Sequence, residues 1–228
     1  MHSAQPGAAE VSCFVARHVR WTRPPLCPEL ALGLGPGDAV RAAQERRWGL
    51  GQPYPYWCIA WPAGQAIARW ILDHAQGVRG RAVLDLGAGC GAAAIAAGIA
   101  GARRVVAADP DCFARASAAR NARRNRVVIG TTGVDVLAAQ GPWDVILAAD
   151  LWYEPFLAGR ASAWLAGQVR SGRTVLLADS GRAHFTRPRH PPAACFAVPA
   201  DPCLEPGSSV NVTLWTLGAP YDSAPPGS

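Results

Sequence analysis

The stretch Val83-Leu84-Asp85-Leu86-Gly87-Ala88-Gly89-Cys90-Gly91 decides the fold class of this 228-residue chain. A mostly apolar run is followed by glycine at every second position, a pattern typical of a buried strand that ends in a tight loop. The apolar segment at 92–99 follows at once and predicts a helix. A strand, a glycine loop and a helix in this order form the ligand-binding corner of an open α/β sheet.

Strands and helices alternate along the middle of the chain. Besides the strand at 82–86, the pattern predicts strands at 104–108, 126–129, 143–148 and 174–178, and helices at 92–99, 112–125 and 155–169. This order is typical of βαβ units, so we expect an α/β fold with a doubly wound, mostly parallel sheet. Near the end, Val210, Val212 and Leu214 alternate with other residues, which predicts a half-buried antiparallel strand.

Both ends of the chain lack this alternation. The first 55 or so residues are interrupted by proline and predict one helix, near 36–47, before Trp61-Pro62 opens the next. From residue 218 onward the chain is small, polar and rich in proline, which predicts a disordered tail at 218–228. We therefore expect a single domain over 1–217 with an irregular N-terminal extension over about 1–55.

The composition is that of an ordinary globular protein, with 50% apolar and 17% charged residues. No run approaches the ~20 apolar residues of a membrane span, and the first residues do not read as a secretory signal. These features predict a cytoplasmic protein without a membrane partner. The seven cysteines form no C-x-x-C pair, and the five histidines have no ligand spacing, so no metal site is expected.

The net charge is +6, and all 22 basic residues are arginine. Four of them, Arg120, Arg123, Arg124 and Arg126, lie around the end of one predicted helix. Such a cluster can attract nucleic acid, but cations also stabilise a helix C-terminus. The other arginines are scattered, so nucleic acid is not the partner we expect.

Three aspartates surround the glycine loop. Asp85 precedes the loop by two residues, Asp109 ends the second strand, and Asp135 follows the third. These places suit S-adenosylmethionine (AdoMet): Asp85 for its cationic amino end, which a dinucleotide lacks, Asp109 for both ribose hydroxyls, and Asp135 for the adenine amino group. The alternative for each aspartate is that it only caps the helix or turn that follows.

The whole pattern resembles class I AdoMet-dependent methyltransferases. Four segments, 55–65 (PYWCIAWPAGQ), 83–92 (VLDLGAGCGA), 150–154 (DLWYE) and 175–182 (VLLADSGR), look together like the electron-transfer-flavoprotein β-subunit lysine methyltransferase family. The resemblance covers about residues 25–217. It implies a Rossmann-like sheet of seven strands with an antiparallel last strand.

The resemblance also implies that Trp61 lies against the cofactor, although a staple at the start of its own helix is the alternative. The expected AdoMet-binding residues are therefore Trp61, Asp85, Gly87, Ala88, Gly89, Asp109, Asp135, Val136 and Ala149.

The run Asp150-Leu151-Trp152-Tyr153 follows the fourth strand, at the sheet edge toward which the methyl group should point. It is similar to the D-x-x-Y element of lysine-directed methyltransferases, although Glu154 stands where Asp often follows. We expect Asp150, Tyr153 and Glu154 to be the catalytic residues. Trp152 and Tyr153 can flank a cation, with core packing as the alternative for Trp152. The Asn-Pro-Pro-Tyr element of amide and nucleobase amino methylases is missing, which favours an amine acceptor.

The resemblance thus implies a protein-lysine N-methyltransferase with an electron-transfer flavoprotein β subunit as its protein substrate. Two alternatives stay open. One is a small-molecule N-methyltransferase that acts on an amine or a nicotinamide-like acceptor. The other is a non-catalytic module that binds AdoMet or RNA through the arginines at 120–126.

Overall fold

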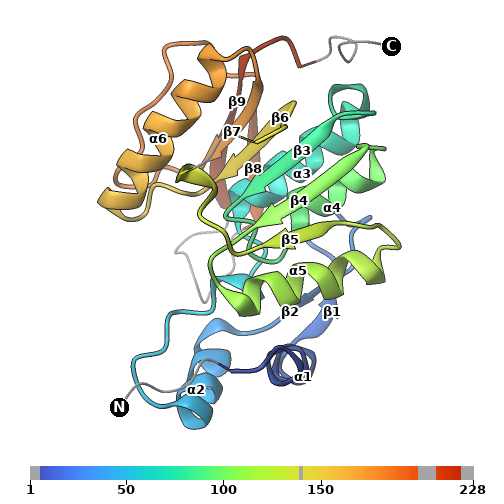
Figure 1. Ribbon diagram of the computed structural model, residues 1–228, viewed down its shortest axis with the longest axis vertical. Coiled ribbons are helices and arrows are strands. Elements are labelled where there is room, and N and C mark those ends of the chain that lie inside the picture. Colours follow the sequence, from blue (N-terminus) through green and yellow to red (C-terminus); the bar gives the residue numbers. More distant parts are fainter. Residues whose placement is uncertain (1–5, 139–140, 200–208, 222–228) are drawn as a thin grey trace.

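A seven-stranded sheet forms the centre of the computed structural model, which describes residues 6–138, 141–199 and 209–221 (Figure 1). Its strands lie in the order β5-β4-β3-β6-β7-β9-β8. Their bounds are β3 Ala82–Leu86, β4 Arg104–Ala108, β5 Gly130–Thr132, β6 Val145–Ala149, β7 Thr174–Asp179, β8 Ala194–Pro199 and β9 Ser209–Gly218. The first five pair in parallel, and β9 is antiparallel to both β7 and β8. The predicted mostly parallel sheet with an antiparallel last strand is confirmed.

Helices cover both faces of the sheet (Figure 1). One face carries α3 Pro62–Asp73, α4 Ala92–Ile99 and α5 Cys112–Arg124, and the other carries α6 Pro155–Arg170. Successive residues of β3 pack on opposite faces of the sheet. Val83 lies in the core with α3 and α4, and Leu84 lies in the core with α6. In the part of the chain that the structure describes, no helix has the length and apolar character to cross a membrane.

The third strand begins later than the sequence predicted. Its apolar signal lies at 126–129, but β5 spans Gly130–Thr132. Arg126 has a left-handed φ of 59°, and the N–H of Val127 donates to the carbonyl of Ala122 at 3.1 Å. Both features belong to the turn that ends an α-helix. The apolar residues at 127–129 therefore belong to the turn and the connection after α5, and the strand starts only after them.

The edge strand β8 Ala194–Pro199 was not predicted as a strand at all. It pairs with β9, and Val198 is its buried residue while most of the others are half-buried or exposed. An edge strand with one solvated face needs no continuous apolar run, and a proline is tolerated at its end. The segment therefore has little of the pattern on which strand prediction depends.

The first 55 residues hold more regular structure than the irregular extension that we expected. They form α1 Ala8–His18, a hairpin of β1 Arg20–Thr22 and β2 Leu32–Leu34, and α2 Gly37–Trp48. Only α2 corresponds to the helix predicted near 36–47. In α1 the buried residues Val11, Phe14 and Val15 have helical spacing, so this part of the signal was present in the sequence.

Asn121 of α5 and Asn125, the C-cap residue of that helix, attach this hairpin to the sheet. Asn121 accepts a hydrogen bond from the N–H of Gly33 at 2.8 Å and donates to the carbonyl of Cys90 at 2.9 Å. Asn125 accepts from the N–H of Ala31 and donates to its carbonyl, at 2.9 and 2.8 Å. Because Asn121 contacts both the hairpin and the glycine loop, the two segments share one support.

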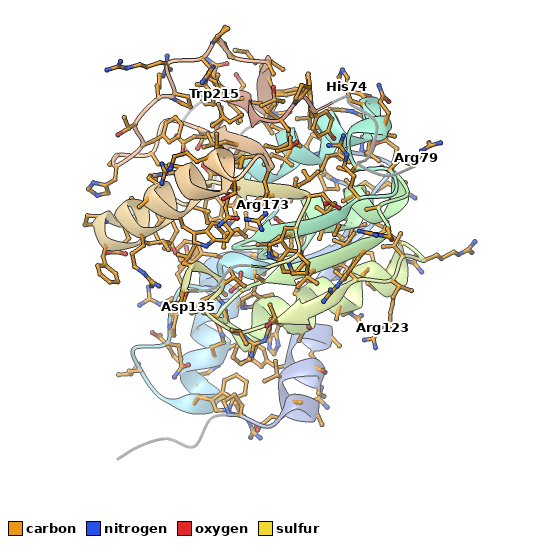
Figure 2. All side chains as sticks on the ribbon, turned by 45° about the horizontal axis from the view of Figure 1, so that its top comes forward. His74, Arg79, Arg123, Asp135, Arg173 and Trp215 are labelled. Atoms are coloured by element: carbon orange, nitrogen blue, oxygen red, sulfur yellow. The ribbon has the colours of Figure 1, made fainter. Side chains whose placement is uncertain are left out.

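Two arginines of the predicted cluster contact the N-terminal hairpin. The guanidinium carbons of Arg120 and Arg124 lie 4.8 and 5.2 Å from the ring centroid of Trp21 in β1, within range of a cation–π contact. Arg126 forms the turn after α5, and Arg123 points away from the body of the protein (Figure 2). Contacts with the hairpin therefore account for two of the four arginines.

The described end of the chain is packed where a disordered tail was predicted. Gly218 ends β9, and Tyr221 is buried with its ring centroid 6.2 Å from that of Trp70 in α3. The prediction is therefore wrong for residues 218–221, and positions 222–228 lie outside the described residues.

Candidate active site

A cavity of about 740 Å³ opens at the carboxyl ends of β3, β4 and β6. The chain runs from β3 outward through β4 to β5 and returns to β6 on the other side of β3, so the cavity lies where the strand order reverses. Small-ligand pockets span about 300–1,000 Å³, so the cavity can hold a nucleoside-sized molecule. Its walls contain nine of the predicted site residues, Trp61, Asp85, Gly87, Ala88, Gly89, Asp109, Ala149, Asp150 and Tyr153.

The glycine loop forms one wall with an exposed backbone. Gly87, Gly89 and Gly91 have left-handed φ values of 69°, 52° and 80°. A Cβ on Gly91 would lie 2.9 Å from the Cβ of Ala118, so a side chain there would push the loop off α5. A Cβ on Gly89 would meet nothing within 4 Å, because this residue faces the cavity. The loop therefore lets a ligand approach the backbone closely.

Asp85 is a buried carboxylate at the back of this wall. It is 3% exposed, and it accepts a hydrogen bond from the N–H of Ala94 in α4 at 3.0 Å. Burial raises the pKa of Asp85 to about 7, and the negative charge of Asp109 adds to the rise. A cation at this place would stabilise the charged form of such a carboxylate. The amino end of AdoMet, which the sequence predicts here, fits that requirement.

We expect AdoMet affinity to rise with pH until Asp85 is ionised. The cationic amino group favours the carboxylate form, which dominates only above its pKa of about 7. Below that pH, binding must release a proton, so the Kd should fall by up to about tenfold per pH unit and become constant above it. Calorimetric titrations between about pH 5.5 and 7.5, in buffers of different ionisation enthalpy, measure both the Kd and the proton release.

The Asp85→Asn variant is the control for this profile. Burial also raises the pKa of Asp109 and of Asp111, so only a variant at Asp85 isolates its contribution. We expect weak AdoMet binding by this variant and a flat profile near pH 7. A flat profile in the unchanged protein would contradict the assignment. The folding stability of the free protein has the opposite pH dependence. Because the pKa of Asp85 is raised in the folded state, this stability decreases as the pH rises from about 4 to about 7.

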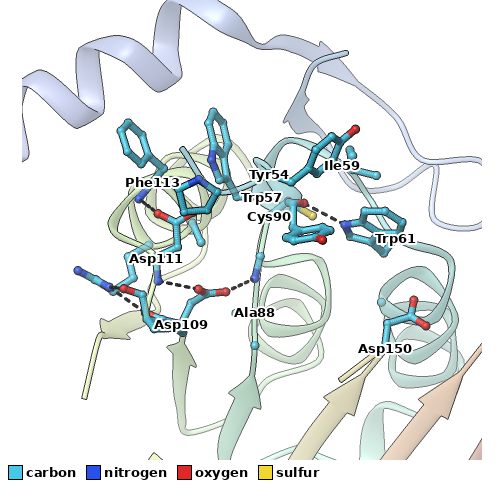
Figure 3. Close-up of a pocket in the computed structure, with 18 of the residues that line it drawn as sticks. Tyr54, Trp57, Ile59, Trp61, Ala88, Cys90, Asp109, Asp111, Phe113 and Asp150 are labelled. Carbon is cyan, nitrogen blue, oxygen red and sulfur yellow. Dashed lines mark hydrogen bonds between the residues drawn. The ribbon is translucent and has the colours of Figure 1, made fainter. Parts of the chain in front are cut away.

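Asp109, which follows the neighbouring strand β4, holds the glycine loop from its side. Its carboxylate accepts hydrogen bonds from the N–H of Gly89 at 3.0 Å and from the N–H of Asp111 at 2.9 Å (Figure 3). Burial raises its pKa, and these two N–H groups oppose the rise. The carboxylate therefore holds the glycine loop in place while it lines the cavity, where its remaining lone pairs can accept from a ribose diol.

Three predicted site residues do not line this cavity. Asp135 is exposed and forms an ion pair with Arg160 of α6 at 2.5 Å (Figure 2). Val136 begins the short helix η3 Val136–Ala138 beside it. Glu154 is the N-cap of α6, and its two oxygens accept from backbone N–H groups of the first turn at 2.9 and 2.8 Å. The structure thus gives these two acids an ion pair and a helix cap, at places that do not favour the predicted adenine contact and catalytic role.

Asp150 is fixed at the acceptor side of the cavity, below Trp61 in the view of Figure 3. It has a left-handed φ of 50° and is 9% exposed. Its carboxylate accepts from the hydroxyl of Ser180 at 2.8 Å, from Nε of Arg182 at 3.0 Å and from the N–H of Ala63 at 3.4 Å. Ser180 and Arg182 belong to the 175–182 segment of the family pattern, but no feature of the sequence predicts that they pair with Asp150.

The two aromatic residues of the D-x-x-Y element point to different environments. Trp152 is 2% exposed, and its Nε1 donates to the hydroxyl of Ser162 in α6 at 2.9 Å. Tyr153 is 51% exposed and lines the cavity. Core packing, the alternative for Trp152, is therefore confirmed, and Tyr153 alone of the pair can meet an acceptor.

The sequence also missed several aromatic residues of the cavity wall. Tyr56 and Trp57 belong to the short helix η1 Tyr56–Cys58, and Phe113 lies in the first turn of α5. Trp57 stacks on Phe113 with ring centroids 6.0 Å apart and an interplanar angle of 13°. The density of aromatic residues at 54–61 was a signal, but only the fold shows which of these rings face the cavity.

The chain is similar to proteins described as electron transfer flavoprotein beta subunit lysine methyltransferase. It is 40% identical to the Xenopus laevis protein over 189 residues, which cover 80% of this chain and 76% of that protein. It is 41% identical to the human protein over 135 residues, or 58% of this chain and 52% of that protein. The match to the human relative thus spans about half of its length.

Residues 69–151 match the family model described as ribosomal protein L11 methyltransferase (PrmA). Among solved structures, a putative RNA methyltransferase from Pyrococcus horikoshii has a TM-score of 0.52 and 15% identity over 81% of this chain and 99% of that chain. Magnesium protoporphyrin IX methyltransferase from Synechocystis PCC 6803 with bound SAH also has 0.52 and 15%, over 80% and 98%. At this identity the similarity concerns the Rossmann-like methyltransferase fold.

Proposed function

Since the chain belongs to the electron transfer flavoprotein beta subunit lysine methyltransferase family and is an AdoMet-dependent methyltransferase, we propose that it methylates lysine side chains of a protein, namely an electron-transfer flavoprotein β subunit. One observation carries the assignment of an amine acceptor. Asp150 and Tyr153 line the same cavity as Asp85 and Asp109, so the acceptor side and the cofactor side meet in one space.

AdoMet, when bound, supplies a methyl group on a sulfonium, which an amine lone pair attacks while the C–S bond electrons go to sulfur. The chain's own residues bind and align. Asp85 would hold the amino end and Asp109 the ribose, while Trp61 and Ala149 line the same cavity as these groups and Asp150. Well-aligned reactants avoid about 7–11 kcal/mol of the barrier, so this positioning is the main contribution of the protein.

A lysine must lose one proton before its nitrogen has a lone pair, because its pKa is about 10.4 in water. Asp150 already accepts from three donors and is paired with Arg182, so it is suited to orient an N–H of the acceptor rather than to take its proton. The proton then leaves to water through the mouth of the cavity. Placing the amine beside the positive sulfonium lowers the amine's pKa and favours this loss.

Mass spectrometry of lysine methylation in the native host, with and without this gene, tests the proposal. We expect methylation to disappear from lysines of the electron-transfer flavoprotein β subunit and to return when the purified enzyme and AdoMet are added. Methylation lost from another protein would reject the flavoprotein but keep the lysine acceptor. Transfer of label from AdoMet only to small molecules would reject protein-lysine methylation itself.

A further inference from the structure

Three aromatic rings from separate segments meet at the acceptor side of the cavity. Tyr56 belongs to η1, Trp61 precedes α3, and Tyr153 follows β6; all three line the cavity. The ring of Tyr56 lies between the others, with its centroid 5.7 Å from that of Trp61 and 5.5 Å from that of Tyr153. The interplanar angles of 51° and 35° show that the rings are tilted and do not form a flat stack, and all three border the same space.

These rings are held in place without being buried. Nε1 of Trp61 donates to the backbone carbonyl of Tyr56 at 3.0 Å, which fixes the two residues to each other. Tyr56 and Tyr153 are nevertheless 46% and 51% exposed, whereas Trp57 beside them is 1% exposed. Packing of the core therefore explains Trp57 but not why two tyrosine rings stand open side by side at a cavity.

The surroundings of the rings suit a cation. The guanidinium carbon of Arg182 lies 5.3 Å from the ring centroid of Trp61, so the Trp61 ring already makes a cation–π contact. Arg182 is itself paired with Asp150, so its charge is compensated. Burial is the first cause that raises the pKa of Tyr153, and the negative fields of the Asp109 and Glu154 carboxylates are among the further causes. A field of this sign also attracts an ammonium group.

We propose that Tyr56, Trp61 and Tyr153 form an aromatic cage for the alkylammonium group of the acceptor, and that Tyr56, which was not among the predicted site residues, is its central wall. The inference rests on the proposed lysine acceptor. Positive charge develops on the acceptor nitrogen as the methyl group is transferred, so ring faces around it stabilise the product and the approach to it. The cage holds alkylammonium ions of increasing size, because each ring face attracts the charge without a fixed hydrogen bond.

Two probes of equal shape test the cage in the full-length protein with S-adenosylhomocysteine bound. One is the trimethyllysine derivative blocked at both ends, and the other is its neutral analogue in which carbon replaces the ammonium nitrogen. NMR titration compares their affinities. We expect the cation to bind roughly 3- to 30-fold more tightly than the neutral analogue. Equal affinities, or no binding of the cation at millimolar concentration, would overturn the cage.

Variants show whether Tyr56 provides the preference. Tyr56→Leu should bring the ratio of the two affinities close to one, and Tyr56→Phe should keep it, because only the ring face is needed. Phe156→Leu is the matched control, since Phe156 is 69% exposed in α6 and does not line the cavity. A ratio that persists in Tyr56→Leu would overturn the proposal. Equal affinities in the unchanged protein, while that protein still methylates lysine, would reject the cage but keep the proposed function.

Discussion

Replacing Asp109 with alanine is expected to weaken AdoMet binding by at least about 100-fold. The carboxylate lines the cavity just after the end of β4, where two ribose hydroxyls would donate to it. Hydrogen bonds to a charged group contribute about 1.5–3 kcal/mol each, and about 1.4 kcal/mol is a factor of ten in Kd. The same substitution removes the acceptor for the N–H groups of Gly89 and Asp111, so the glycine loop also loses its support. Calorimetric titration with AdoMet measures the change.

Asp135→Ala is the matched control for this experiment. The sequence predicts a cofactor contact for both aspartates, but the structure places Asp135 on the surface in an ion pair with Arg160. We therefore expect its Kd to stay within about threefold of that of the unchanged protein. Thermal melts show whether each variant is folded, and Asp109→Asn, which keeps the shape and one acceptor oxygen, serves if the alanine variant unfolds. Similar losses in both variants would contradict the cavity as the AdoMet site.

The central half of the fold could be predicted because its signals are local. The strands and the helix around the glycine loop lie where periodicity placed them, as β3 Ala82–Leu86, α4 Ala92–Ile99 and β4 Arg104–Ala108. A parallel strand buried on both faces has a continuous apolar run, and a loop at positive φ requires glycine. Both properties depend on residues that are neighbours in the sequence, so these elements can be predicted without knowledge of distant contacts.

The parts that failed depend on contacts between distant residues. An acid after a strand looks the same in sequence whether its loop turns inward, as at Asp109, or outward, as at Asp135. The hairpin near the N-terminus is held by Asn121 and Asn125, whose side-chain oxygens accept hydrogen bonds from backbone N–H groups of the hairpin. Hydrophobic periodicity does not identify these asparagines as contact residues, because a polar residue in or next to a helix normally faces water.

The Asp150→Asn variant is expected to lower kcat/KM for the acceptor by about 100-fold or more. The amide has one acceptor oxygen, so it cannot replace all the contacts with Ser180, Arg182 and the N–H of Ala63. Arg182 then has lost its countercharge beside the acceptor, and two unit charges 4 Å apart repel by about 4 kcal/mol at an effective dielectric constant of 20. Asparagine tolerates the left-handed φ of 50° at this position, so the variant avoids the backbone strain that alanine would introduce.

Glu154→Gln makes the same acid-to-amide change four residues later in the chain. The two variants together test whether Glu154 is catalytic or only caps α6. The sequence predicts catalytic roles for both acids, whereas the structure gives Glu154 only the capping of α6. Glutamine retains an oxygen for the cap, so we expect kcat/KM within about threefold of the unchanged enzyme. AdoMet affinity, measured for both variants, separates loss of the acceptor from loss of the cofactor. A large loss at Glu154 with little loss at Asp150 would mean that the D-x-x-Y loop rearranges before transfer and brings Glu154 into the cavity.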